Sequence, residues 1–355
     1  MKLLDIFKSL VAIDSPSFGE DRVALFLEQK LLALGFSTRY DAAGNLYGYL
    51  GGEGDALMLN THMDTVDLAV GAHVVVEDDI IRSDGTTALG ADDKAAVAAL
   101  LHALEKVITE GRKHPPLVVL FTIAEETGLA GAKQVDRSLL DAVSCGYTFD
   151  ASGPVGGAII QASYHDRLDV VIGGKAAHAG FKPEDGVSAI KIGSDAIAAM
   201  HLFRIDEETT ANVGSFVAPG ATNVISSEAT IHFEARSLDE EKIDKQINHM
   251  VEVLEKTARL AGGTVHTHHY RLYEGYRHHT DSPVVRRFTE ACGALKIPVE
   301  FKKTQGGSDA NIFNGLGIPT LTCCVGYENA HSKEEYIPLS ELERLASLIE
   351  EIIVR

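Results

Sequence analysis

The chain has 355 residues, a length that favours two domains over one. Its net charge of −19 repels nucleic acid and anionic membrane surfaces, and no cluster of lysines and arginines offsets that charge, so we expect neither as a partner. The four cysteines lack zinc-finger spacing, and no apolar run approaches the length of a membrane span. Asp5 and Lys8 interrupt the apolar start of the chain, which argues against a secretory signal and predicts a cytoplasmic protein.

The first 163 residues alternate between helical and strand-like patterns. The elements predicted in this part are, in chain order, helices over 3–13 and 22–34, a strand over 56–60, a helix opening at Asp93, a strand over 117–124 and a strand ending at Asp150. Gly35 supplies the stop after the second helix, and Pro115-Pro116 breaks the chain before the next strand. This alternation is typical of a mostly parallel sheet with flanking helices.

The pattern changes after residue 163, where strands outnumber helices. The elements predicted there are a strand over 168–172, a helix over 186–203, strands over 210–217 and 229–235, a helix opened by the capping box Ser237–Glu240, and a strand over 264–270. The order β-α-β-β-α-β is that of the ferredoxin-like unit, which can fold as a compact domain by itself. Helix–strand alternation resumes near Ser282, and a second S-x-x-E pattern, Ser340–Glu343, predicts the start of a terminal helix.

These patterns predict an α/β catalytic domain that is interrupted by an inserted α+β domain. We assign residues 1–163 and 274–355 to the catalytic domain, with its mostly parallel sheet and flanking helices. We assign residues 164–273 to an inserted ferredoxin-like lid.

Three of the predicted strands end in residues that can bind metal ions. His62 and Asp64 follow the first strand, Glu125 and Glu126 follow the second, and Asp150 ends the third. A doubly wound sheet binds its ligands in the crevice beyond the carboxyl ends of its strands. A single acid after a strand is usually a solvated loop residue, but three such strand ends together favour one metal site.

A glycine-rich segment delivers two consecutive acids, Asp92 and Asp93, to the start of a helix. Helix capping is one interpretation, because the helix dipole favours acids at this end. Two adjacent acids exceed what capping requires, and one carboxylate using both oxygens could bridge two cations about 3.5–4 Å apart. Side chains alternate along a strand, so one of the adjacent glutamates can bind a metal while the other faces the substrate as a general base.

The late motif Asn329–Ser332 adds a second imidazole. A lone histidine is more often structural than a ligand, but a two-metal site needs another nitrogen. The candidate ligands are His62, Asp92, Glu126, Asp150 and His331. Two imidazoles and three carboxylates suit zinc, and the same donors accept cobalt or manganese. Asp64 lies on the same face as His62 and is expected to hydrogen-bond to its ring and fix its tautomer.

These motifs, in this order, resemble the metal site of a known family. The motifs that carry the resemblance are His62-x-Asp64, Gly90-Ala91-Asp92-Asp93-Lys94, Glu125-Glu126, Asp150 and His331. They are similar to those of the M20 family of zinc metallopeptidases and amidohydrolases, and the wording of the segment 83–94 is most similar to its peptidase T branch. The resemblance implies a zinc-exopeptidase-like fold that holds two zinc ions in each subunit.

The resemblance also implies a role for each residue of the metal site. The implied ligands of the first zinc are His62, Asp92 and Asp150, and those of the second are Asp92, Glu126 and His331. Asp92 would then bridge the two ions, often with a cis peptide to Asp93, and Glu125 would be the general base.

The inserted domain is implied to serve as a lid and as the dimerisation domain. His178, in the segment Lys175–Gly180, is implied to reach an active site, commonly that of the partner subunit, and to stabilise the oxyanion. The residues implied to contact the substrate are Asn223, Arg236, Ser308 and Asp309. Without the resemblance, each of these four residues could also be a turn or salt-bridge residue.

We therefore expect a di-zinc hydrolase that cleaves a peptide bond in short peptides, as an aminopeptidase or tripeptidase does. Glu125 would take a proton from a water activated by the metal pair. An N-acyl amino acid deacylase using the same site is the alternative chemistry, which these motifs do not distinguish from a peptidase. The residues after His331 lack the second histidine of tripeptidases, which argues against tripeptide specificity and leaves the metal chemistry unchanged. A non-catalytic peptide-binding protein is a further alternative, against which the intact Glu125 argues. The expected partners are a short peptide and a second copy of the chain.

Overall fold

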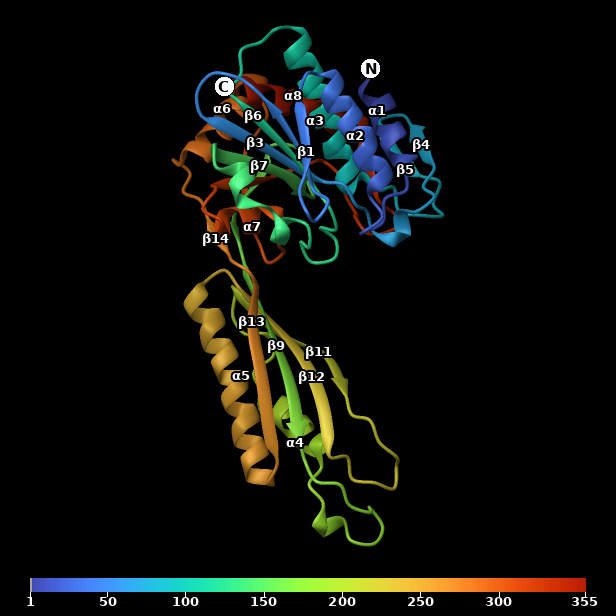
Figure 1. The fold of residues 1–355 in the computed structure, drawn as a ribbon, viewed down its shortest axis with the longest axis vertical. Coiled ribbons are helices and arrows are strands. Elements are labelled where there is room, and N and C mark those ends of the chain that lie inside the picture. The colour runs from blue at the N-terminus through green and yellow to red at the C-terminus, as the bar shows by residue number, and fades with distance from the viewer. Residues whose placement is uncertain (1) are drawn as a thin grey trace. The chain divides into compact units, whose positions relative to one another are not determined.

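The computed structural model describes residues 2–355, which form two compact units (Figure 1). The first unit comprises residues 2–161, Arg277–Lys303 and Ser308–Arg355. The second comprises Ala162–Tyr276 and the short segment Thr304–Gly307. No helix within residues 2–355 combines the length and the apolar character needed to cross a membrane.

A nine-stranded sheet forms the centre of the first unit (Figure 1). Its strands are, in spatial order, β1 (Ser37–Tyr40), β2 (Leu46–Leu50), β6 (Leu117–Thr122), β3 (Ala56–His62), β7 (Val143–Ala151), β16 (Thr320–Cys324), β8 (Gly157–Ala162) and β14 (Tyr276–Arg277), with β15 (Glu300–Thr304) pairing with β8. The four central strands β6, β3, β7 and β16 are parallel, while β1, β2 and β8 pair antiparallel with their neighbours. The predicted mostly parallel sheet is therefore confirmed.

Helices cover both faces of this sheet. They are α1 (Leu3–Val11), α2 (Asp21–Ala33), α3 (Ala91–Thr109), α6 (Pro283–Leu295), α7 (Asp309–Gly315) and α8 (Leu339–Val354). Every residue of β3 and β6 is buried, as a strand covered on both faces requires. Leu57 and Leu59 of β3 join the larger core with α1, α2, α3, α6 and α8, whereas Met58 joins a smaller core with Phe313 of α7. The period of two along the strand thus divides its side chains between two helical layers.

A small antiparallel sheet leads into the last helix. It consists of β4 (Val74–Glu77), β5 (Ile80–Ser83) and β17 (Tyr336–Pro338), in the order β17-β5-β4. Helix α8 begins at Leu339, so the predicted capping role of Ser340 is wrong. Ser340 instead donates from its backbone nitrogen and its hydroxyl to the Asp79 carboxylate, at 3.0 and 2.5 Å. A carboxylate from the β4–β5 turn therefore caps this helix.

The second unit is a five-stranded antiparallel sheet with two long helices. Its elements are β9 (Tyr164–Gly173), α4 (Ala189–Ala199), β10 (Phe203–Arg204), β11 (Thr209–Val217), β12 (Glu228–Ser237), α5 (Glu240–Ala261) and β13 (Thr264–Tyr273), and the strand order is β10-β11-β12-β9-β13. Apart from the short β10, this is the predicted β-α-β-β-α-β order. Leu168, Val170 and Ile172 of β9 pack with both helices in a core of the unit's own.

The ends of the two helices in this unit differ from prediction because other residues cap them. Ser188 accepts a hydrogen bond from the Lys191 nitrogen and starts α4 later than predicted. Asp239, and not Ser237, caps α5 by accepting from the Lys242 nitrogen. Both are side-chain oxygens that satisfy a free amide of the first helical turn.

Four short 3₁₀ helices complete the described chain. They are Asp67–Ala69, Ala132–Gln134, Arg137–Leu140 and Pro183–Asp185. Thr304–Gly307 belongs to the second unit. Its carbonyls accept from the Ser163 amide, at Thr304 and 3.2 Å, and from the Arg236 guanidinium, at Gln305 and 3.0 Å.

Replacing Asp79 with alanine removes the cap of α8 and should lower the free energy of unfolding of the first unit by about 1 kcal/mol. Asp79→Asn keeps one acceptor oxygen and should cost less. Urea denaturation followed by helical circular dichroism measures both. Equal stability of Asp79→Ala and the wild type would contradict the assignment of the cap.

Candidate metal centre and catalytic site

Three neighbouring parallel strands bring the candidate residues to one edge of the sheet. His62 is the last residue of β3, Glu125 and Glu126 follow the end of β6, and Asp150 lies at the end of β7. In the register of the sheet, His62 pairs with Thr122, and Asn60 pairs with Thr148. Asp150 therefore lies level with His62 on the adjacent strand, at the carboxyl edge where the prediction placed it.

The first group of potential ligands surrounds the His62 ring. Its Nε2 atom lies 3.2 Å from Oδ1 of Asp92 and 3.6 Å from Oδ1 of Asp150. Ligand atoms about 2.0–2.2 Å from a tetrahedral zinc ion are roughly 3.2–3.6 Å apart, so these separations match a shared cation.

The second group surrounds the His331 ring. Its Nε2 atom lies 2.8 Å from Oε1 of Glu126 and 3.2 Å from Oδ2 of Asp92. The two oxygens of Asp92 thus face two different imidazoles, Oδ1 toward His62 and Oδ2 toward His331. This arrangement is what a bridging carboxylate requires.

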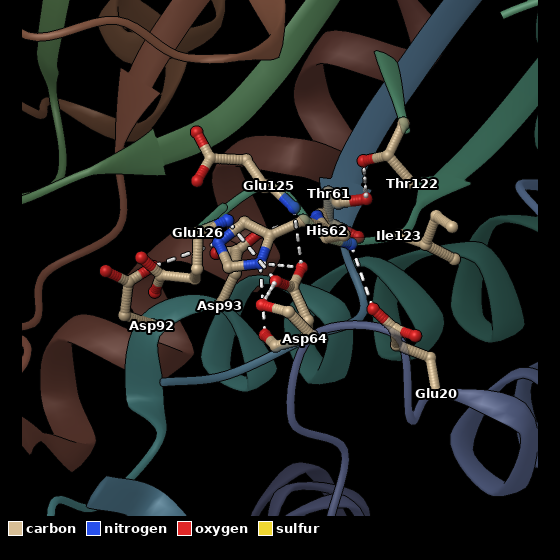
Figure 2. Close-up of polar contacts among 12 residues, drawn as sticks. Glu20, Thr61, His62, Asp64, Asp92, Asp93, Thr122, Ile123, Glu125 and Glu126 are labelled. Atoms are coloured by element: carbon tan, nitrogen blue, oxygen red, sulfur yellow. Dashed lines mark hydrogen bonds and ion pairs between the residues drawn. The ribbon is translucent and has the colours of Figure 1, made fainter. Parts of the chain in front are cut away.

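Glu125 and Glu126 diverge from each other at the end of β6. The Glu126 side chain reaches toward Asp92, whereas the Glu125 side chain extends in a different direction (Figure 2). A carboxylate oxygen of Glu125 still lies within 4.8 Å of ligand atoms of His62 and Asp150. Glu125 is therefore beside the first group without belonging to the second.

Burial and close contacts shift the pKa values of several ionisable groups in this site. Burial raises the pKa of Asp150 to about 7, against an opposing hydrogen bond from His62. Burial and then the charge of Asp150 raise the pKa of Glu125 well above its ordinary value. Hydrogen bonds to Asp92 and Glu126 raise the pKa of His331 to about 10.

No described lysine or arginine pairs with Asp92, Glu126 or Asp150, although all three side chains are at most 11% exposed. Buried carboxylates need a compensating positive charge, and divalent cations would supply it. The donor set of two imidazoles and three carboxylates therefore fits the predicted metal pair.

Asp64 is a buried hydrogen-bond centre beneath the His62 ring (Figure 2). Its carboxylate lies 3.2 Å from Nδ1 of His62 and accepts from the amides of Glu125 and Glu126 at 3.0 and 3.2 Å. The Ser17 hydroxyl donates to it at 2.7 Å. Burial alone would raise the pKa of Asp64, but the hydrogen bond from His62 and then that from Ser17 lower it. Asp64 therefore orients the imidazole and both glutamates together.

The start of α3 places Asp92 through an irregular backbone. The Asp92–Asp93 peptide bond is cis, as the resemblance implied, and both residues have non-helical backbone angles. One oxygen of Asp93 accepts from the His62 amide at 3.2 Å. The Glu335 carboxylate accepts from the amides of Gly90 and Asp92 at 2.8 and 3.0 Å.

Three residues that contact the site's backbone or Asp64 were absent from the predicted set. Ser17 and Asp93 carry no signal in their spacing that assigns these contacts. Glu335, four residues after His331, carries a weak one.

The predicted substrate residues in the second unit occupy two places. His178 is exposed and forms a β-bridge with Val224, so it lies beside Asn223. The Asn223 carbonyl accepts from the Ala179 amide at 2.9 Å. Arg236 is half-buried and donates to the Tyr273 hydroxyl at 3.1 Å, in addition to its bond with Gln305.

The predicted substrate turn in the first unit, Ser308–Asp309, is buried. The Ser308 hydroxyl lies 2.9 Å from that of Thr322, and an oxygen of Asp309 accepts from the Thr122 hydroxyl at 2.5 Å. Asp309 is only 1% exposed, and burial raises its pKa to about 6. These contacts tie the start of α7 to β16 and β6 of the large sheet.

Comparison with known proteins agrees with the geometry of the site. The family model "Peptidase family M20/M25/M40" matches residues 58–355. The chain belongs to this peptidase family. It is 40% identical over 362 residues to the uncharacterized protein YqjE of Bacillus subtilis, covering 99% of this chain and 97% of that protein. It is 28% identical over 281 residues to peptidase T of Enterococcus faecalis, covering 76% of this chain and 66% of that enzyme.

Two solved structures share the fold over almost the whole chain. The aminopeptidase PepT of Bacillus cereus superposes with a TM-score of 0.92 at 37% identity, and a tripeptidase of Staphylococcus aureus with 0.93 at 39%. Each comparison covers 99% of this chain and 97% of the other. The predicted resemblance to an M20 metallopeptidase close to peptidase T is thus confirmed.

Replacing Asp64 with asparagine should destabilise the metal-free protein by about 1–3 kcal/mol, because an amide group would face donors that now bond to a carboxylate. Ser17→Ala removes only one of these donors and should cost about 0.5–1.5 kcal/mol. Urea unfolding in the presence of a chelator measures both. Equal stability of the two variants would refute the role of Asp64 as the shared acceptor of these hydrogen bonds.

Proposed function

We propose that this M20 peptidase is a di-metal aminopeptidase that acts on short peptides, as a tripeptidase does. The observation that carries the proposal is the Asp92 carboxylate, which directs one oxygen to His62 and the other to His331. The high similarity to structures described as an aminopeptidase and a tripeptidase supports the substrate class.

Two groups of three residues would hold the metal pair. The first is His62, Asp92 and Asp150, and the second is Asp92, Glu126 and His331. Zinc suits these donors, and cobalt or manganese would also be accepted. When bound, the metal pair supplies Lewis acidity that polarises the substrate carbonyl and lowers the pKa of water.

Glu125 would act as the general base and then as the general acid. Its carboxylate lies beside His62 and Asp150. Its amide donates to Asp64, and this hydrogen bond fixes the backbone from which the side chain extends. It would accept the proton of the attacking water and return it to the leaving amine. Asp64 would keep the His62 ring in the orientation that presents Nε2 to the metal.

The second unit would act as a lid and as the dimerisation domain. The His178 Nδ1 atom accepts a hydrogen bond from the Gly180 amide at 3.1 Å, so its neutral ring carries the proton on Nε2. An exposed Nε2–H donor is suited to bind a developing oxyanion. Asn223, adjacent to His178, would contact the substrate together with Arg236. Ser308 and Asp309 of the first unit would also contact it.

Glu125→Gln tests the assignment of the base. This variant should bind both metal ions with unchanged affinity and lose turnover by about 10²–10⁴-fold. Glu126→Gln is the matched control, since the same change at the adjacent residue should weaken metal binding instead. Steady-state kinetics and elemental analysis measure the two effects. Near-normal turnover in Glu125→Gln refutes its role.

Metal removal tests the rest of the proposal. A chelator should abolish hydrolysis, and added zinc, cobalt or manganese should restore it with two ions for each chain. In a panel of dipeptides, tripeptides and N-acyl amino acids, the restored enzyme should cleave tripeptides with a free α-amine. Preferential cleavage of the acylated compounds would show a deacylase with the same metal centre.

A further inference from the structure

Glu335 links the start of α3, which carries Asp92, to the loop that carries His331. Its side chain is 1% exposed, and it lies four residues after His331. Its Oε2 atom accepts from the Gly90 amide at 2.8 Å and its Oε1 atom from the Asp92 amide at 3.0 Å. The two oxygens thus accept from the backbone amides on either side of Ala91, and one of these is the amide of Asp92 itself.

The start of α3 depends on this distant carboxylate. Gly90 is the residue before the helix, in the left-handed region with φ 73°, and it provides no side-chain cap. Asp92 and Asp93 depart from helical backbone angles, so the amides of this turn cannot all bond within the helix. Glu335 takes the place of a local cap and fixes the backbone from which the Asp92 carboxylate extends.

The loop that carries His331 is closed at its base by two backbone hydrogen bonds between Glu328 and Tyr336, at 2.9 and 3.2 Å. Asn329 and His331 have φ of 55° and 63°, which is unfavourable for residues other than glycine. The His331 side chain is 51% exposed, so packing does not hold the ring in place. The Ser332 hydroxyl bonds within the loop, to the Asn329 carbonyl at 2.8 Å. Glu335 is the buried point at which this loop meets α3.

We propose that Glu335 is a positioning residue that sets Asp92 and His331 at the separation needed to bind the second cation. The inference rests on the proposed function, because it assumes that Asp92, Glu126 and His331 hold a metal ion. A carboxylate is the side chain that accepts from two amides at once, with a charge that strengthens both bonds. Glu335 touches the backbone of a ligand and neither the metal nor the substrate.

Glu335→Gln tests this role, with Glu334→Gln as its matched control. The glutamine would offer one acceptor oxygen and would turn its amide group toward a backbone amide. Glu334 is adjacent and exposed, and its replacement removes the same charge. The full-length protein is stripped with a chelator and titrated with manganese or zinc by calorimetry. Wild type and Glu334→Gln should bind two ions alike, whereas Glu335→Gln should bind one of the two about 10–100-fold more weakly.

A second readout separates positioning from general destabilisation. At saturating metal concentration, Glu335→Gln should recover kcat and keep the wild-type KM, because the residue does not contact the substrate. Glu335→Asp keeps two oxygens on a shorter side chain and should weaken the same ion several-fold, and it decides the question if the glutamine variant does not fold.

The outcomes distinguish this inference from the proposed function. Two ions bound with wild-type affinity by Glu335→Gln, or by Glu335→Asp if that variant alone folds, overturn the positioning role and leave the di-metal proposal intact. A wild-type protein that binds fewer than two ions refutes the di-metal proposal itself.

Discussion

The active-site architecture depends on the placement of one carboxylate, that of Asp92. Its two oxygens are 3.2 Å from the nitrogens of two imidazoles that come from opposite ends of the sequence. Such a contact cannot form unless β3, α3 and the loop after β16 are all in place. The free energy of folding of the whole first unit is therefore what holds the ligands of the two groups together.

The parallel sheet brings several acidic side chains together in a buried place. The parallel strands β3, β6 and β7 end at one edge, and each contributes residues from the position where its hydrogen-bonded ladder stops. Asp64 uses this edge to tie the end of β3 to the chain after β6, through the amides of Glu125 and Glu126. Repulsion among the acids opposes this arrangement, which is why the proposed metal pair and the fold are expected to stabilise each other.

Sequence patterns predicted the parts of the fold that depend on local periodicity and on strand ends. His62, Glu126 and Asp150 could be grouped because parallel strands end at one edge, a rule that needs no knowledge of side-chain packing. The caps could not be predicted, because Asp79 and Glu335 act on helices distant in sequence. At α5 the capping box predicted Ser237 as the cap, but Ser237 is the last paired residue of β12, and Asp239 caps the helix instead.

The insertion of the second unit has a consequence for how the chain reaches its native state. The chain leaves the large sheet after β8 and returns as β14, and these two strands are neighbours in that sheet. The His278 amide bonds to the Ile160 carbonyl at 2.7 Å, close to this junction. The two points at which the chain leaves and re-enters the first unit therefore lie side by side. A short linker could join them in place of the second unit. During synthesis, however, the central strand β16 and the edge strand β14 follow the inserted unit, so the large sheet is completed only after the whole second unit has been made. The second unit can complete its own core first.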